Sequence, residues 1–195
     1  MVSSIEREFK TLLTKEQYQQ LINYFQLNAE KAIIQTNHYY DTDDSQFKSI
    51  KSALRLRIFQ DQTSEWTIKQ QLNEIDSLEL TQHNPEPLST IPIYITPTLI
   101  HAKEMQDFIN KQNIHWLSIQ PTQSFKTTRY YIESDEGLYA LDATDFSHHS
   151  DFELELESDD IERGFTQFSA LLERFNISYQ QSETKLARAF AYSDK

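Results

Sequence analysis

The stretch "SIEREFKTLLT", residues 4–14, carries charged side chains at the alternate positions 6, 8 and 10. On an extended strand, side chains alternate between two faces, so Glu6, Glu8 and Lys10 share one face. Two acids and a base in a row are ordinary on a solvated face and unusual on a buried one. The fold therefore depends on which environment this face meets.

Composition and charge set the first bounds. The chain has 195 residues, of which 38% are hydrophobic and 12% aromatic, so it can bury a real core, and we expect a single domain over residues 1–195. The formal net charge of -12 opposes the phosphate backbone of nucleic acids, so no nucleic-acid partner is expected. A basic cavity inside an acidic surface is compatible with this charge, because net charge does not fix where the charges lie.

Several chemistries lack the residues they need. The chain has no cysteine, which excludes disulfides, thiolate catalysis and zinc–thiolate sites. Its only two glycines, Gly137 and Gly164, cannot form a Walker loop or a dinucleotide-binding fingerprint. The first residues show no secretion signal and no stretch is apolar enough to span a bilayer, so we expect a cytoplasmic protein with no membrane partner. Any phosphate must then be bound by side chains.

Helical periodicity recurs along the chain. Thr14 and Gln17 form a capping-box pattern before an apolar stripe, which predicts a first helix. Thr96 followed by Pro97 is typical of a helix start, with Thr96 as N-cap and Pro97 in the first turn. The expected helices cover about residues 15–25, 97–110 and 161–175, with a short helix near the C-terminal end in "SETKLARAFAY".

Period-two alternation predicts further strands between these helices. Turn signals at residues 134–137 and 147–150 separate the later strands, and a proline-bearing stretch over 85–97 interrupts the run. The expected strands after residue 13 are 33–42, 53–59, 64–72, 77–82, 124–134, 138–146 and 151–158.

Like charges repeat on single strand faces. Arg55 and Arg57 share one face, and so do Glu153, Glu155 and Glu157. For any one strand, the ordinary explanation is the solvated face of an antiparallel sheet. Alternatively, the amphipathic helices cover the apolar face from outside, and the charges line the interior of a closed barrel. Buried charges need partners, and a polyphosphate with a divalent metal supplies both signs.

A family resemblance favours the second interpretation. "IEREFK" resembles the N-terminal Glu-x-Glu-x-Lys signature of the CYTH superfamily, the triphosphate tunnel metalloenzymes. A lone signature of this kind has little specificity, but matching segments follow in the family's order from about Ile5 to Phe190. They are "NHYYDT", "ALRLR", "WTIK", "SLELTQ", "KTTR", "LDATDF", "FELELE" and "TKLARAF".

The resemblance implies both a fold and an activity. The fold is α+β, mainly β: an eight-stranded closed antiparallel β-barrel, open as a tunnel, with helices packed outside. The implied activity is hydrolysis of the terminal phosphoanhydride of a triphosphate, either inorganic tripolyphosphate or a small organic triphosphate, with Mg²⁺ or Mn²⁺. The partner would be this small-molecule substrate, and the protein a monomer or homodimer.

The resemblance also assigns roles to individual residues. As metal-side carboxylates it implies Glu6, Glu8, Glu153 and Glu155, with Glu157 as a further candidate. As phosphate-binding groups it implies Lys10, Arg55, Arg57, Lys69, Arg129 and Lys185. For catalysis, Arg57 and Lys69 would stabilise charge on the transferring phosphate, and Asp142 would orient the attacking water, with Asp145 as the alternative.

Two segments depart from the family pattern. The segment around Glu79 lacks a dense acidic and basic cluster. Lys126 and Arg129 have opposite parity on a regular strand, so both cannot face the same way without a bulge, and we favour Arg129.

Three other functions stay open on the sequence alone. An adenylate cyclase would need a nucleoside pocket, and no adenine-binding feature is legible. A polyphosphate or nucleotide sensor would bind without turnover. A barrel for an apolar ligand would place Arg55 and Arg57 on the outside.

Overall fold

The computed structural model describes residues 2–193. Its strands form one antiparallel sheet in the order β1-β5-β4-β3-β2-β6-β7-β8, which closes as an eight-stranded barrel and confirms the predicted fold class. The strands are β1 (Val2–Leu13), β2 (Ile33–Asp41), β3 (Ser52–Phe59), β4 (Ser64–Gln71), β5 (Asp76–Asn84), β6 (Gln120–Ser134), β7 (Gly137–Asp145) and β8 (Ser150–Glu157).

The chain divides into two compact units. The first comprises Met1–Ile5 and Thr36–Ser124, and the second comprises Glu6–Gln35 and Phe125–Lys195. The expectation of a single domain over residues 1–195 stays a prediction. The helices are α1 (Lys15–Tyr24), α2 (Gln46–Ser49), α3 (Lys103–Lys111), α4 (Ile161–Arg174) and α5 (Lys185–Ser193), with short 3₁₀ turns at Ala29–Lys31 and Trp116–Ser118. None of these helices, over the residues described, is long and apolar enough to cross a membrane.

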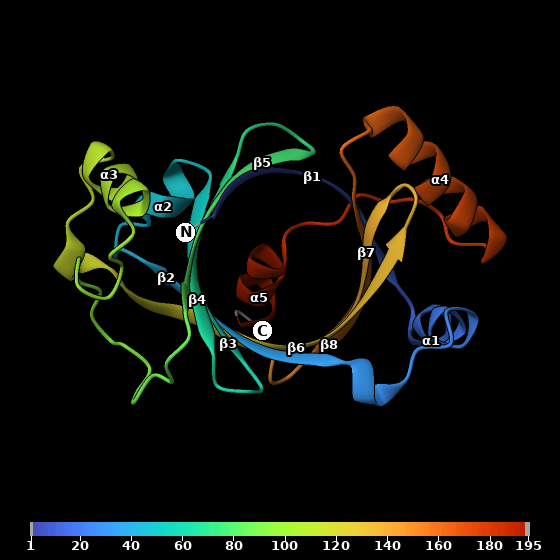
Figure 1. Cartoon of the computed structure of the whole chain (residues 1–195), viewed down its shortest axis with the longest axis horizontal. Helices are drawn as coiled ribbons and strands as arrows, with labels where there is room; N and C mark the ends of the chain where they lie inside the picture. Colours follow the sequence, from blue (N-terminus) through green and yellow to red (C-terminus); the bar gives the residue numbers. More distant parts are fainter. Residues whose placement is uncertain (1, 194–195) are drawn as a thin grey trace. The chain divides into compact units, whose positions relative to one another are not determined.

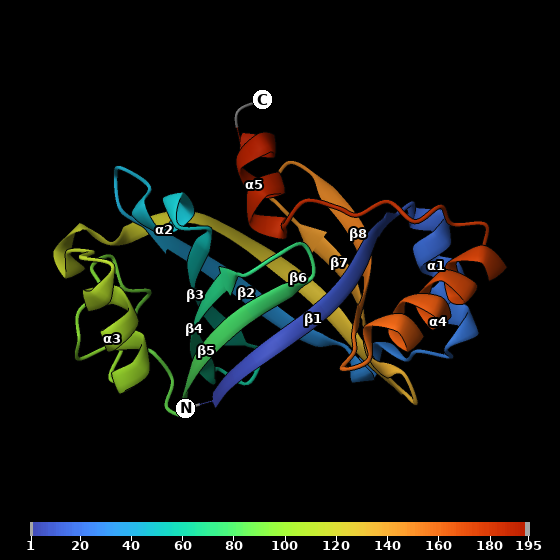
Figure 2. The ribbon, with the colours of Figure 1, turned by 90° about the horizontal axis from the view of Figure 1, so that it is seen from above.

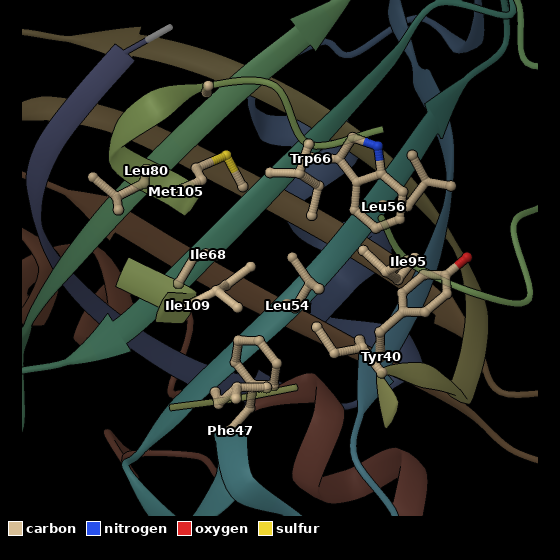
Figure 3. Packing of buried hydrophobic residues seen from close by; sticks show 14 residues of the cluster. Tyr40, Phe47, Leu54, Leu56, Trp66, Ile68, Leu80, Ile95, Met105 and Ile109 are labelled. Carbon is tan, nitrogen blue, oxygen red and sulfur yellow. The ribbon is translucent and has the colours of Figure 1, made fainter. Parts of the chain in front are cut away.

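In the first unit, alternate residues of β3, β4 and β5 build one apolar face. The register places Leu56 opposite Trp66 and Leu54 opposite Ile68, so these side chains lie on the same side of the sheet. Helix α3 covers this side (Figure 3). The buried cluster includes Leu54, Leu56, Trp66, Ile68, Leu80, Met105 and Ile109. Since the apolar side chains of these strands are buried on this face, the charged side chains that alternate with them lie on the opposite face.

The second helix begins later than the sequence predicts. Helix α3 starts at Lys103 rather than near Pro97. The side chain of Gln82 on β5 accepts hydrogen bonds from the backbone N–H groups of His101 and Ala102, each at 2.8 Å. This tertiary contact satisfies the N–H groups that precede the helix, so Thr96 heads only a separate turn.

In the second unit, helices cover both faces of β7 and β8. Tyr18 of α1 packs on Phe152 of β8, and Phe168 of α4 stacks near Tyr139 of β7. Figures 1 and 2 show α5 on the other side of these strands from α1 and α4. The apolar parity of β8 therefore faces α1 and α4, and its acidic parity faces α5.

The turn between β6 and β7 depends on a glycine. Gly137 has φ +146°, a backbone conformation that residues with a Cβ rarely adopt. A Cβ at this position would collide with the carbonyl oxygen of Glu157 on β8. The glycine thus lets β7 start close against the end of β8.

Candidate active site

The charged face of the first unit is ordered in cross-strand rows. One row joins Arg57 on β3, Glu65 on β4 and His83 on β5, and a parallel row contains Lys69 opposite Glu79. Residues in such a row share a face of the sheet. The predicted Arg57 and Lys69 therefore point the same way, and Glu79 lies beside Lys69, with Lys69 Nζ 3.3 Å from a Glu79 carboxylate oxygen.

Arg57 is held by two partners that sequence reasoning missed. Its Nε donates to the side-chain oxygen of Asn37 on β2 at 3.1 Å, and its Nη1 donates to Glu65 Oε1 at 3.1 Å. Asn37 and Glu65 are both buried. The alternation of Glu65 with Trp66 was the available signal, because it places Glu65 on the charged face. These contacts fix the guanidinium plane of Arg57.

The side chain of Arg55 has a buried donor that could bind a ligand. One Nη donates to Thr67 Oγ1 at 3.4 Å, and its Nε is buried without a hydrogen-bond partner among residues 2–193. Burial alone would lower the pKa of Arg55, but Tyr39, Glu79 and Glu65 raise it above its usual value. Arg55 is therefore a firmly charged group with an unused donor, which suits an anionic ligand.

The second unit gathers three carboxylates, Asp142, Glu153 and Glu155, which we call the carboxylate group. Asp142 on β7 lies opposite Glu153 on β8, and Glu155 is two residues further along the same face of β8. One oxygen from each residue lies within 4.8 Å of the others. Such hard oxygen donors are the ligands that Mg²⁺ and Mn²⁺ prefer, so this set fits a divalent cation.

Two basic side chains bind the carboxylate group. Arg129 on β6 donates to both oxygens of Asp142, at 2.7 and 2.6 Å, and to Glu155 at 2.7 Å. Lys185, the first residue of α5, lies 2.9 Å from Asp142 and 2.6 Å from Glu155, and also bonds Glu153. Every charge in this cluster thus meets an opposite charge, as buried ions require.

These contacts shift the pKa values of the cluster. Burial would lower the pKa of Lys185, but Glu153, Glu155 and Asp142 together raise it well above its ordinary value of 10.5. Burial would raise the pKa of Glu155, yet Lys185, Arg129 and Lys10 bring it well below 4.5. Lys185 is therefore protonated and Glu155 ionised over the whole neutral range.

The opening strand contributes its predicted residues to this unit. Lys10 lies opposite Glu155, and Glu8 lies opposite Glu157, in the register of β1 with β8. Lys10 donates to Glu8 at 2.8 Å. Glu6 has the same parity but precedes the part of β1 that pairs with β8, and neither Glu6 nor Glu8 belongs to the carboxylate group.

The remaining candidates lie on the opposite face. Lys126 on β6 pairs in register with Asp145 on β7, and both side chains are exposed. Arg129 and Asp142 pair three residues further along, on the face that holds the carboxylate group. Asp142 is fully buried against Arg129 and Lys185, so a water could reach its carboxylate only if one of these side chains moved.

Sequence reasoning missed two further charged residues of this face. Asp151 and Arg188 are buried and joined by a 2.7 Å hydrogen bond from Arg188 Nε. A signal existed for each: Asp151 continues the two-residue period of Glu153 and Glu155, and Arg188 stands three residues after Lys185 on a helix.

Fold and site together define a closed antiparallel β-barrel protein whose strands carry paired acidic and basic rows. The chain belongs to the CYTH domain family, whose model matches residues 4–190. This confirms the resemblance that the ordered sequence segments indicated.

Individual relatives agree over nearly the whole length. "Putative triphosphatase YjbK" of Bacillus subtilis (strain 168) is 30% identical over 190 residues, which is 97% of this chain and 96% of that protein. The crystal structure of a putative adenylate cyclase from Bacillus halodurans has a TM-score of 0.80 and 27% identity, covering 96% of this chain and 98% of that one. The putative adenylyl cyclase HpAC1 from Hippeastrum, described as having a dominant triphosphatase activity, also has a TM-score of 0.80. At 20% identity, with 96% of this chain and 95% of that chain covered, it shows the shared fold.

Proposed function

We propose that the protein is a divalent-metal-dependent triphosphatase acting on inorganic tripolyphosphate or a small organic triphosphate. The observation that carries this proposal is the carboxylate group in direct contact with Lys185 and Arg129. Membership of the CYTH family and the 30% identity to a protein named as a triphosphatase support the same reaction.

The reaction requires few covalent changes. Water attacks the terminal phosphorus, the bond from that phosphorus to the bridging oxygen breaks, and the diphosphate leaves with the electron pair of that bond, while the water oxygen becomes part of inorganic phosphate and its proton passes to solvent. The bound cation would neutralise phosphate oxygens and promote loss of a proton from the attacking water. The protein's part is to hold the phosphates and to offset the charge that moves onto the leaving group.

We assign the basic residues of both units to the phosphate oxygens. Arg55 and Arg57 suit this role because a guanidinium presents a planar fork of donors to an oxyanion. In the second unit, Arg129 and Lys185 are the corresponding cations. The full proposed set is Lys10, Arg55, Arg57, Lys69, Arg129 and Lys185, with Glu6, Glu8, Glu153 and Glu155 on the metal side.

The ion pairs of the second unit indicate how the charged side chains would accept a phosphate chain and a cation. Lys185 and Arg129 neutralise the carboxylates, so no buried charge is uncompensated. A phosphate chain with a divalent cation brings the same two signs. Asp142, Glu153 and Glu155 would hold the cation, and Arg129 and Lys185 would hold phosphate oxygens, so each charge would keep a partner.

A cyclase is the second candidate, because a 27% identical structure is described as a putative adenylate cyclase. The products separate the two reactions. A triphosphatase releases inorganic phosphate, whereas a cyclase converts ATP into cyclic AMP and pyrophosphate. A non-catalytic sensor would bind triphosphate and release neither product.

The test measures these products from tripolyphosphate, ATP and thiamine triphosphate with Mg²⁺, Mn²⁺ or a chelator. We expect phosphate release that requires a metal. Arg57→Ala should lower turnover by about 100-fold or more, since it removes a cation from the transferring phosphate. Glu65 keeps Arg55 and His83 as neighbours, so the variant should fold.

Arg174→Ala is the matched control, because Arg174 contacts only the surface ring of Tyr24 in the bonds described. It should retain wild-type turnover. Wild-type turnover in Arg57→Ala would refute the role of Arg57, and cyclic AMP as the main product would replace the proposed reaction with the second candidate.

A further inference from the structure

Arg188 of α5 joins two acidic residues of one strand. Its side chain is 6% exposed, and its Nε donates to Asp151 at 2.7 Å. Its two Nη atoms donate to the two oxygens of Glu153, at 3.1 and 3.3 Å. Asp151 and Glu153 are two residues apart on the same face of β8, so the planar guanidinium can donate hydrogen bonds to both at once. A lysine at this position could not reproduce that fork.

The same contact determines where Lys185 lies. Lys185 and Arg188 are three residues apart on α5, so their side chains leave the same side of the helix. Because Arg188 fixes this side against β8, Lys185 is directed at the carboxylate group. Figures 1 and 2 show α5 on this side of β7 and β8.

Glu153 is bonded from several points of the C-terminal segment. Its Oε1 accepts from Ser182 Oγ at 2.5 Å and from Arg188, and its Oε2 accepts from Lys185 and Arg188. Its side chain is 1% exposed. Glu153 thus joins the segment from Ser182 to Arg188 to the carboxylate group, while Glu155 has 14% of its side chain exposed.

We propose that Arg188 and Asp151 are positioning residues that hold α5 on β8 and thereby place Lys185 at the carboxylate group. This inference rests on the proposed function for the role of Lys185 in binding phosphate. Asp151 bonds Arg188 and approaches Tyr192, and neither is among the proposed phosphate-binding residues. Both positioning residues act through Lys185 and do not touch the substrate.

The first test measures the reactivity of Lys185 directly and needs no substrate. The folded protein is treated with acetic anhydride, and acetylation of each lysine is followed by mass spectrometry. In the wild type, Lys185 should react slowly, because only 13% of its side chain is exposed and its amine is ion-paired. In Arg188→Gln and Asp151→Asn, it should react roughly tenfold faster, because local opening of α5 exposes the amine.

Internal and matched controls define the comparison. Lys103 and Lys111 on α3 should react at the same rate in every variant. Arg174→Gln, which changes an arginine on the surface of α4, should leave Lys185 slow. If Arg188→Gln does not fold, Asp151→Asn decides the question, since it removes a charge with almost no change of volume.

The second test is a double-mutant cycle on tripolyphosphate turnover. Each single variant should lower kcat. The double variant should lower it no further than Arg188→Gln alone, because both changes remove the same contact between α5 and β8. Unchanged acetylation of Lys185 in both folded variants would overturn the positioning role, whatever happens to melting temperature. Absence of phosphate release by the wild type would refute the proposed function, while the acetylation rates would still decide where Lys185 is held.

Discussion

Replacing Asp142 with asparagine removes the most deeply buried charge of the candidate site. Asp142 is fully buried and accepts two hydrogen bonds from Arg129, at 2.7 and 2.6 Å. It also lies 2.9 Å from Lys185. Asparagine keeps the volume but removes the charge and presents an amide donor where an acceptor is required. Arg129 and Lys185, each with 13% of its side chain exposed, then share fewer acidic partners.

The structure indicates the size of the effect. Removing one partner of a buried ion pair costs about 3–5 kcal/mol of unfolding free energy. Arg129 retains Glu155, and Lys185 retains Glu153 and Glu155, so the lower end of about 3 kcal/mol applies here. For a chain of this size, 1 kcal/mol shifts the melting temperature by about 2–4 °C, which predicts a decrease of about 6–12 °C.

The assay is thermal unfolding followed by circular dichroism at neutral pH. Asp145→Asn is the matched control, because Asp145 lies on β7 with an exposed side chain on the opposite face. Its effect should stay below about 1 kcal/mol. If Asp142→Asn melts within the same narrow range as the control, the ion pairs described here do not stabilise the second unit.

Two further predictions concern the backbone and the pH dependence. Gly137→Ala should lower the unfolding free energy by roughly 1–3 kcal/mol, measured by urea denaturation, because φ is +146° and the new Cβ meets the Glu157 carbonyl; no measurable loss would contradict the strained geometry. Since the pKa of Lys185 is raised in the folded state, its contribution to stability is complete below its ordinary value of 10.5 and is lost as pH rises through the folded value. The pKa of Glu155 is lowered, so its contribution is present above 4.5 and is lost as pH falls through the folded value. Between about pH 5 and pH 10, titration of Lys185 or Glu155 should therefore cause no change in the melting temperature. A change in this range that disappears in Lys185→Met would contradict the raised pKa of Lys185.

Features governed by local periodicity were predictable from the sequence. The opposite orientation of Lys126 and Arg129 follows from the two-residue period of a strand, and the structure places them on opposite faces. The capping box at Thr14 and Gln17 is confirmed at the start of α1, because both hydrogen bonds form within four residues.

Features that depend on tertiary contacts were not predictable in the same way. Arg188 and Asp151 are 37 residues apart, and only the docking of α5 on β8 joins them. The start of α3 depends on Gln82 of strand β5, whose side chain accepts hydrogen bonds from the backbone of residues 101 and 102. Glu65 was visible on the charged face, but its contact with Arg57 required the register of β3 and β4.

The most direct test of the proposed function is phosphate release from tripolyphosphate by the wild type and by Glu155→Gln, each with Mg²⁺, Mn²⁺ or a chelator. Glu155 contacts both Arg129 and Lys185 and keeps part of its side chain exposed. We predict release by the wild type that stops with the chelator and falls by about 100-fold or more in Glu155→Gln. Equal release by both proteins, or release that persists in the chelator, would contradict a metal-dependent reaction at the carboxylate group.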